Sequence, residues 1–299
     1  MSLHVFWHPS SLEHDPGPGH PESTARLAAV LDELRMPHLV KTVVWRESES
    51  AETGVLLRGH TYEHVVALRA AHAQGGAFID PDTRMNASTW PAALHAAGAA
   101  VGAALTALDG TPAFAAIRPP GHHATRSRAM GFCFLNNVAI AAYAALERDG
   151  VARVLIVDWD VHHGNGTQDI VERDERIRYV SLHQWPLYPG TGREAERGVG
   201  NIFNVPQPPG LPRRHYQAVL QAAVDRATDG WTPDLILISA GFDAMAGDPL
   251  AGFTLEPEDY AWWVERWKTI GAPMAAVLEG GYVPHRIRYA AAATVAALA

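Results

Sequence analysis

The segment DWDVHHGNG places two carboxylates and an imidazole close together near the middle of the chain. Asp158, Asp160 and His162 alternate along the sequence, and side chains two residues apart point to the same side of an extended segment. Asp160 and His162 can therefore reach one cation. Acidic residues at such positions also cap helices, but the combination of two carboxylates with a histidine favours a metal site.

A third ligand must come from another part of the chain, and Asp243 at the end of ILISAGFD is the best candidate. Two carboxylates and one imidazole neutralise a dication and leave a coordination position open for water. We expect Zn²⁺, while Fe²⁺, Co²⁺ and Mn²⁺ are compatible with oxygen-rich ligands. A two-metal site would need an acidic residue two positions after His162, where Gly164 stands, so one catalytic metal is predicted.

Two adjacent histidines, His122 and His123, follow the sequence Pro-Pro-Gly. Proline fixes the backbone and glycine permits a tight turn. The pair could lie on the surface, but a rigid turn carrying two imidazoles favours positioned chemistry.

Apolar runs alternate with helical patterns along nearly the whole chain. The strand-like runs are His4–His8, Pro112–Ile117, Arg153–Asp160, Arg178–His183, Asp234–Asp243 and Met274–Tyr282. The helical patterns are Glu22–Arg35, Thr61–Ala73, Trp90–Leu108, about Asn136–Glu147, His215–Asp229, Glu256–Ile270 and Pro284–Leu298. Continuous apolar runs are typical of parallel strands covered by helices, so we predict a single α/β domain over residues 1–299 with a central, mainly parallel sheet. Val205–Pro212 is interpreted as a rigid loop.

Unusual polar clusters follow the carboxyl ends of the predicted strands. They are RPPGHH, DWDVHHGNG, SLHQW, GFDAMAGD and EGGY. Ligands bind beyond these ends in open parallel sheets, so the clusters predict one active site.

Composition narrows the partners. The formal net charge is −8 and the sequence contains no Lys/Arg-rich stripe, which argues against nucleic acid as a partner. The single cysteine excludes an intrachain disulfide, and the sequence contains neither a secretory signal nor an apolar run typical of a membrane span. We therefore expect a soluble, cytoplasmic protein that binds no membrane. Its oligomeric state is not specified by the sequence.

Seven motifs in order make the chain resemble the histone deacetylase family, which includes bacterial acetylpolyamine amidohydrolases and acetoin-utilisation proteins. They are GHPES, RPPGHHA, GFCFLNN, DWDVHHGNGT, SLHQWPLYPGTG, SAGFDAMAGDPL and LEGGY. Asn165 stands where some relatives have Asp, which resembles the class II branch. The resemblance implies an arginase-like α/β fold and zinc-dependent hydrolysis of an acetyl-amide.

This resemblance also implies roles for the histidine pair. His122 and His123 are the expected general base and general acid, in an order that the sequence leaves open. Asp158 is expected to hold the outer nitrogen of His122, and Asn165 is expected to face His123. Tyr282 is expected to donate a hydrogen bond to the oxyanion opposite the metal.

Further positions are carried over from the same resemblance. Phe132 and Tyr188 match the walls of a narrow substrate tunnel, and Gly131 would offer its carbonyl to the substrate. Asp82 and Thr83 fall near a rim loop and form either a substrate contact or a simple turn. Structural K⁺ is implied at an inner site comprising Asp158, Asp160, His162, Ser181 and Leu182, and at an outer site comprising Val171, Asp174, Ile177 and Asn201.

The predicted activity is removal of an acetyl or other short acyl group from acyl-lysine or a related small acyl-amine. The short segment 75–90 favours an open mouth over the narrowed entrance of polyamine deacetylases, although an acetylpolyamine or another small amide remains the alternative substrate. A catalytically silent acyl-lysine-binding module is the other class of function. It is disfavoured because the predicted ligands, both histidines and the tyrosine are all present.

Overall fold

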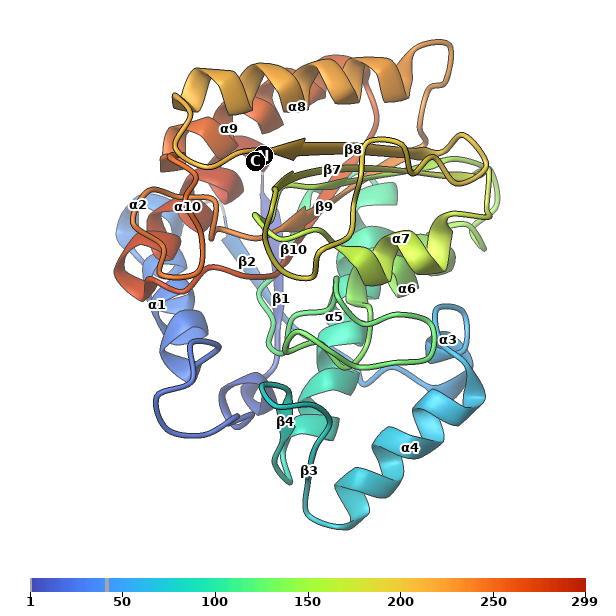
Figure 1. Cartoon of the computed structure of the whole chain (residues 1–299), viewed down its shortest axis with the longest axis vertical. Helices are drawn as coiled ribbons and strands as arrows, with labels where there is room; N and C mark the ends of the chain where they lie inside the picture. The colour runs from blue at the N-terminus through green and yellow to red at the C-terminus, as the bar shows by residue number, and fades with distance from the viewer. Residues whose placement is uncertain (1, 41–42) are drawn as a thin grey trace.

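The computed structural model describes residues 2–40 and 43–299, and a parallel sheet forms their centre (Figure 1). Its strands are β1 (Leu3–Trp7), β2 (Val43–Glu47), β5 (Ala113–Ala115), β6 (Val154–Asp158), β7 (Ile177–Gln184), β8 (Ile202–Gln207), β9 (Leu235–Ala240) and β10 (Met274–Leu278). These eight strands have the order β2-β1-β5-β10-β9-β6-β7-β8. Every neighbouring pair is parallel, so all carboxyl ends meet at one edge. The predicted α/β domain is confirmed.

Helices cover both faces of this sheet (Figure 1). On one face lie α5 (Thr89–Leu108), α6 (Asn137–Ala145) and α7 (Asn165–Val171); the other carries α1 (Thr24–Leu34), α8 (Arg213–Thr228), α9 (Pro257–Trp267) and α10 (Pro284–Leu298). The short helices α2 (Pro37–Val40) and α3 (Thr53–Leu56), the longer α4 (Tyr62–Ala73) and the hairpin β3 (Ala77–Phe78) with β4 (Arg84–Met85) lie outside these layers. Two 3₁₀ turns, Pro9–Leu12 and Lys268–Ile270, complete the described elements.

The strands that carry the site are buried on both sides. Every residue of β6, β9 and β10 is buried, which explains their continuous apolar sequence. Helix α5 lies against β1, β5, β9 and β10, and its many alanines allow this close approach. By length and composition α5 could also span a membrane, but half of its most apolar window is buried within the protein.

Two strands of the central sheet, β2 and β8, were not predicted from the sequence, and each lies at an edge of the sheet. The segment Val205–Pro212 begins as the last residues of β8 rather than as a loop. Asn204 and Pro206 interrupt the apolar pattern there, and proline is tolerated in an edge strand because one side of the strand needs no partner.

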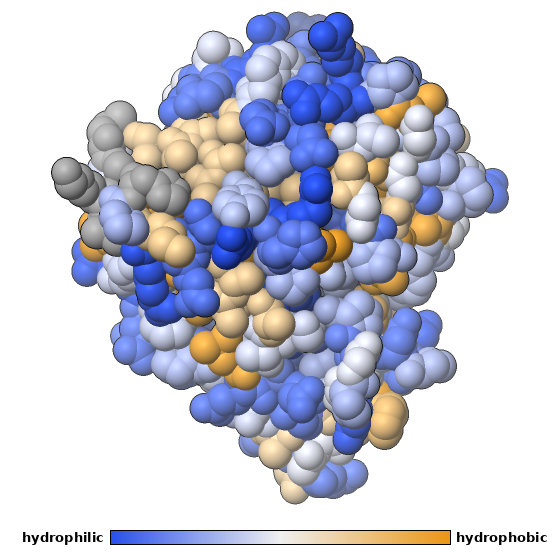
Figure 2. Space-filling view, turned by 90° about the vertical axis from the view of Figure 1, so that its left-hand side faces the viewer, coloured by the Kyte–Doolittle hydropathy of each residue, from blue (hydrophilic) through white to orange (hydrophobic). Residues whose placement is uncertain are grey.

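The surface in Figure 2 is mixed: hydrophilic side chains are interspersed with smaller apolar patches over the face shown. Exposed large apolar side chains include Tyr62 on α4, Phe78 on β3 and Tyr188 after β7. Of these, Tyr188 lies at the edge of the sheet where the strands end.

Candidate active site

Loops that follow four neighbouring strands bring the predicted chemistry together. The histidine pair follows β5, the Asp160–His162 segment follows β6, Asp243 follows β9, and Tyr282 follows β10. Strands β5, β10, β9 and β6 are consecutive in the sheet. Residues distant in sequence therefore converge at its carboxyl edge, as expected for a parallel sheet.

Asp160, His162 and Asp243 form a compact buried cluster. Their ligand atoms all lie within 4.8 Å of one another. His162 Nδ1 is 3.1 Å from Asp160 Oδ1 and 3.1 Å from Asp243 Oδ2. The backbone N–H of His162 also donates to Asp160 Oδ1, and that of Val161 donates to Asp243 Oδ1, so the loop orients both carboxylates.

The chemistry of this donor set fits a divalent cation. Burial, together with the charge of Asp160, raises the pKa of Asp243 to about 7. Two carboxylates this close in a buried site repel each other, and a bound dication removes that penalty. One imidazole and two carboxylates make a three-ligand site with an open position, which is the arrangement of catalytic zinc.

The two histidines of the turn have different partners. His122 Nδ1 is 3.1 Å from Asp158 Oδ2, and His123 Nδ1 is 2.8 Å from the side-chain oxygen of Asn165. The Tyr179 hydroxyl also donates to Asp158 Oδ2 at 2.8 Å. Both rings are nearly enclosed, and their centroids lie 4.0 Å apart.

This difference in partners separates the pKa values of the two rings. Burial lowers the pKa of His122, but the carboxylates of Asp160 and Asp158 outweigh burial and raise it to about 10. Burial and the neighbouring His122 hold the pKa of His123 well below its ordinary value. His122 therefore retains its proton much more readily than His123.

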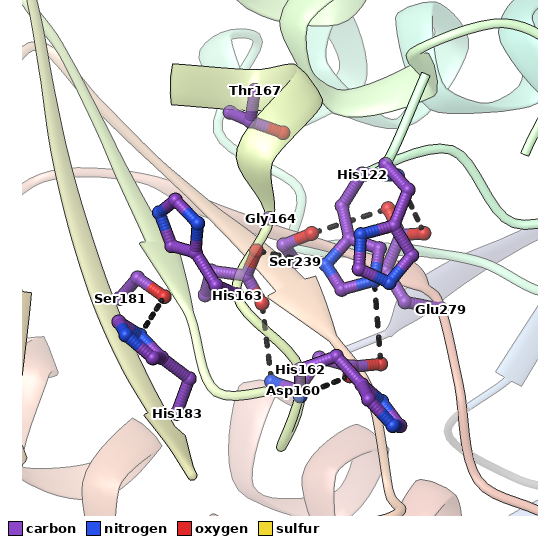
Figure 3. Close-up of polar contacts among 12 residues, drawn as sticks. His122, Asp160, His162, His163, Gly164, Thr167, Ser181, His183, Ser239 and Glu279 are labelled. Atoms are coloured by element: carbon purple, nitrogen blue, oxygen red, sulfur yellow. Dashed lines mark hydrogen bonds and ion pairs between the residues drawn. The ribbon is translucent and has the colours of Figure 1, made fainter. Parts of the chain in front are cut away.

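Glu279 is a buried carboxylate that sequence reasoning missed. Its Oε2 accepts hydrogen bonds from the backbone N–H groups of Gly121 at 2.6 Å and His122 at 3.1 Å. Ser239 donates to its Oε1 at 3.1 Å, and Figure 3 shows this pair beside the His122 turn. Glu279 thus ties the histidine turn to β9 and β10. An acidic residue directly after the fully apolar run of β10 was the available signal.

A pocket of about 360 Å³ opens above the metal cluster. Its lining includes the predicted residues His123, Gly131, Phe132, His162, Tyr188, Asp82 and Tyr282, together with His20, Pro21, Leu187 and Leu250. The Tyr188 ring is perpendicular to that of His123, with centroids 5.1 Å apart, and the Phe132 ring lies 6.0 Å from that of Tyr282. Aromatic and aliphatic side chains therefore form the wall above the candidate metal centre.

The two rim positions differ. Asp82 lines the pocket, and its backbone carbonyl accepts from His20 Nε2 at 3.0 Å. Thr83 is fully buried, and its hydroxyl oxygen accepts from the backbone N–H of Phe132 at 3.1 Å. Of the two alternatives for Thr83, its burial favours the turn: Thr83 supports the backbone of Phe132, which has a φ of 68°.

The residues of the two predicted potassium sites are arranged differently. At the inner site, Asp158 and Ser181 are direct partners in the β6–β7 ladder, and Leu182 follows in β7. Figure 3 shows Ser181 contacting His183 on the same strand, at 2.9 Å between Oγ and Nδ1. At the outer site, the Asn201 side-chain nitrogen donates to the carbonyls of Val171, Asp174 and Ile177. In the outer set the Asn201 amide nitrogen therefore lies among the three carbonyl oxygens.

Comparisons with known proteins cover nearly the whole chain. A model of the histone deacetylase domain matches residues 20–298. A probable deacetylase of Archaeoglobus fulgidus is 38% identical over 313 residues, covering 100% of this chain and 87% of the relative. A histone deacetylase-like amidohydrolase of Pseudomonas aeruginosa is 36% identical over 274 residues, covering 88% and 71%.

A solved structure agrees with these sequence matches. The crystal structure of the HDA15 HD domain has a TM-score of 0.95 and 35% identity, covering 99% of this chain and 88% of that one. The Asp160–His162–Asp243 cluster, the histidine turn and the pocket all lie within the matched residues. This chain therefore belongs to the histone deacetylase family of hydrolases.

Proposed function

We propose that this protein is a zinc-dependent deacylase that hydrolyses the amide of an acylated lysine side chain or a similar primary acyl-amine. The convergence of Asp160, His162 and Asp243 below a pocket with largely apolar walls carries the proposal. The names of the relatives, probable deacetylase and histone deacetylase-like amidohydrolase, support the same reaction.

The metal would be held by those three side chains. When bound, zinc supplies a Lewis acid that polarises the scissile carbonyl and lowers the pKa of water. We also propose structural K⁺ at the inner site beside Asp158 and Ser181.

Protons are moved by the histidine turn. His123 lines the pocket and lies next to His162, with ring centroids 6.0 Å apart, so it is the better placed of the two to exchange protons with substrate. Its neutral partner Asn165 and its lowered pKa keep the ring unprotonated, so its free nitrogen is available to take a proton from water and to pass it to the departing amine. His122, which is hydrogen-bonded to Asp158, keeps its positive charge next to the His123 ring.

The pocket walls position the substrate. Phe132 and Tyr188 flank a straight alkyl chain, and the Tyr282 hydroxyl donates to the oxygen that becomes negative during attack. Burial holds the pKa of Tyr282 well above its ordinary value, so the hydroxyl remains a donor at neutral pH.

The decisive experiment compares substrates with zinc-loaded protein. Acetyl-lysine peptides, free acetyl-lysine and acetylated polyamines are assayed side by side, with Asp243→Ala as the inactive control. We expect acyl-lysine or small acyl-amine turnover in wild type, and loss of both activity and most bound zinc in the variant. Full zinc content in Asp243→Ala would remove Asp243 from the metal site, whereas failure to release acetate from every substrate would reject the deacylase proposal.

A further inference from the structure

Three backbone carbonyl oxygens, from the end of α7, the loop after it and the start of β7, converge on one side-chain atom. The Asn201 Nδ2 group lies 2.8 Å from the oxygen of Val171, 3.1 Å from that of Asp174 and 2.9 Å from that of Ile177. These are the carbonyls expected from the family resemblance to surround the outer potassium. The amide nitrogen stands at the point on which they converge.

The hydrogen bonds already in place use the electron pairs that a cation would need. The Val171 oxygen also accepts from the backbone N–H of Asp174 at 3.0 Å, and the Asp174 oxygen also accepts from that of Ile177 at 3.1 Å. A carbonyl oxygen has two lone pairs. In both carbonyls, therefore, one lone pair serves the backbone turn and the other serves Asn201.

The surroundings fix which end of the amide faces the carbonyls. Asn201 Oδ1 accepts from the backbone N–H of Val199 at 3.2 Å. Turning the amide over would oppose Oδ1 to three carbonyl oxygens and the amino group to an N–H donor, so only one orientation satisfies the network. Asn201 is 3% exposed, and its own backbone carbonyl accepts from Tyr179 at 2.9 Å, so the residue is held on both sides.

We propose that the Asn201 amide permanently replaces the outer monovalent cation in this chain. The Val171 carbonyl ends α7 and carries part of the negative charge of the helix terminus, and the two amide N–H groups of Asn201 supply the partial positive charge that an ion would otherwise bring to the three oxygens. The loop from α7 to β7 is thereby closed without uptake of an ion. This inference does not depend on the proposed deacylase activity.

The direct test is the anomalous scattering of a heavy K⁺ mimic. Crystals of the wild-type protein and of Asn201→Ala are soaked in Tl⁺. We expect no anomalous peak among the three carbonyls in wild type and a peak there in Asn201→Ala, where the cavity is free. A peak among the carbonyls of wild type, with the Asn201 side chain turned away, would overturn the proposal without any variant being needed.

Thermal unfolding provides a second measurement. Wild type, Asn201→Ala and the isosteric Asn201→Asp are melted in KCl and in choline chloride at equal ionic strength. Asn204→Ala, a second buried asparagine three residues away, is the matched control. We expect K⁺ to raise the melting temperature of both Asn201 variants by several degrees more than that of wild type or the control. If K⁺ raised the melting temperature of all four proteins by the same amount, the proposal would be contradicted.

Discussion

At the scale of single residues, Tyr282 is held independently of its hydroxyl. Its backbone N–H donates to Asp248 at 2.8 Å, and the Arg26 guanidinium lies 5.0 Å from the centre of its ring. Tyr282→Phe should therefore keep the ring in place. We predict a fall in kcat of about 10²–10³-fold, because the variant loses the proposed oxyanion donor. KM and zinc content should change little.

Steady-state kinetics and metal analysis of purified Tyr282→Phe check this prediction. An unchanged kcat with normal zinc would make Tyr282 a structural residue.

Glu279 supports a second prediction at this scale. Glu279→Ala leaves the N–H groups of Gly121 and His122 buried without an acceptor, at about 1–3 kcal/mol each. We expect the free energy of unfolding to fall by about 2–6 kcal/mol and kcat to fall while KM is nearly kept, because the pocket walls remain. Glu279→Gln should restore most of both, since its amide oxygen can accept the same bonds.

Glu279→Gln is a suitable rescue variant because burial raises the pKa of Glu279 to about 7. The carboxyl group is therefore partly neutral near pH 7, and the neutral glutamine resembles that state. If Glu279→Ala retained wild-type kcat and stability, the carboxylate would not position the turn. Denaturant unfolding and kinetics at pH 7 give both quantities.

The grouping of Asp160, His162 and Asp243 near the histidine pair could be predicted from sequence because local spacing places Asp160 beside His162, and because strand ends share one edge. The functions of Glu279 and Asn201 could not. Each accepts from or donates to backbone groups far away in sequence, and backbone groups are the same in every residue. Their partners depend on how the loops pass one another in space.

At the scale of elements, α5 depends on close contact with the loop after β2. The Ala51 N–H donates to the Leu94 carbonyl at 3.0 Å, and a Cβ atom at Gly98 would overlap the backbone carbonyl of Glu49. Alanine normally stabilises a helix interior by about 1 kcal/mol relative to glycine. We predict that Gly98→Ala instead lowers the free energy of unfolding, because the new Cβ atom would overlap a backbone atom, which cannot turn aside as a side chain can.

Urea denaturation measures this sign directly, with Gly54→Ala in α3 as the matched control. A Cβ atom at Gly54 would meet nothing within 4 Å, so this variant should be as stable as wild type or more stable. A gain in stability from Gly98→Ala would show that the loop gives way.

Sequence periodicity predicted the central strands better than the edge strands. Every residue of β6 and β9 is buried, so their residue types are nearly all apolar and unmistakable. Strands β2 and β8 have one neighbour each, and they carry charged or polar residues that weaken the pattern. Their pairing depends on the sheet already being present.

At the scale of the whole molecule, buried neutral histidines link folding to pH. Burial lowers the pKa of His60 to about 3 and that of His183 to about 4. His60 Nε2 accepts from the Asn136 N–H at 2.8 Å, which requires the unprotonated nitrogen. Histidines in the unfolded chain have a pKa near 6.5. Between about pH 6.5 and 4, therefore, these two histidines are protonated in the unfolded chain but not in the folded protein.

The predicted consequence is a loss of stability on acidification, by up to about 1.4 kcal/mol per pH unit for each such histidine. Buried acids with raised pKa, such as Glu279, act in the opposite sense over this range. The test is therefore a comparison: His60→Gln should show a shallower fall in unfolding free energy between pH 6.5 and 4.5 than wild type. If the unfolding free energies of wild type and His60→Gln fell in parallel with pH, His60 would not contribute to the pH dependence of stability.

The position of β10 has a consequence for biosynthesis. This strand pairs with β5 on one side and with β9 on the other, so it joins β2-β1-β5 to β9-β6-β7-β8. It is also translated after all seven of its companions. A nascent chain that has emerged only as far as β9 thus holds two half-sheets whose facing edges lack their shared partner, and unpaired edges promote aggregation. Chaperone demand should peak during synthesis of the last helices and strands, and a premature stop codon before Met274 should yield insoluble protein instead of a weakened enzyme.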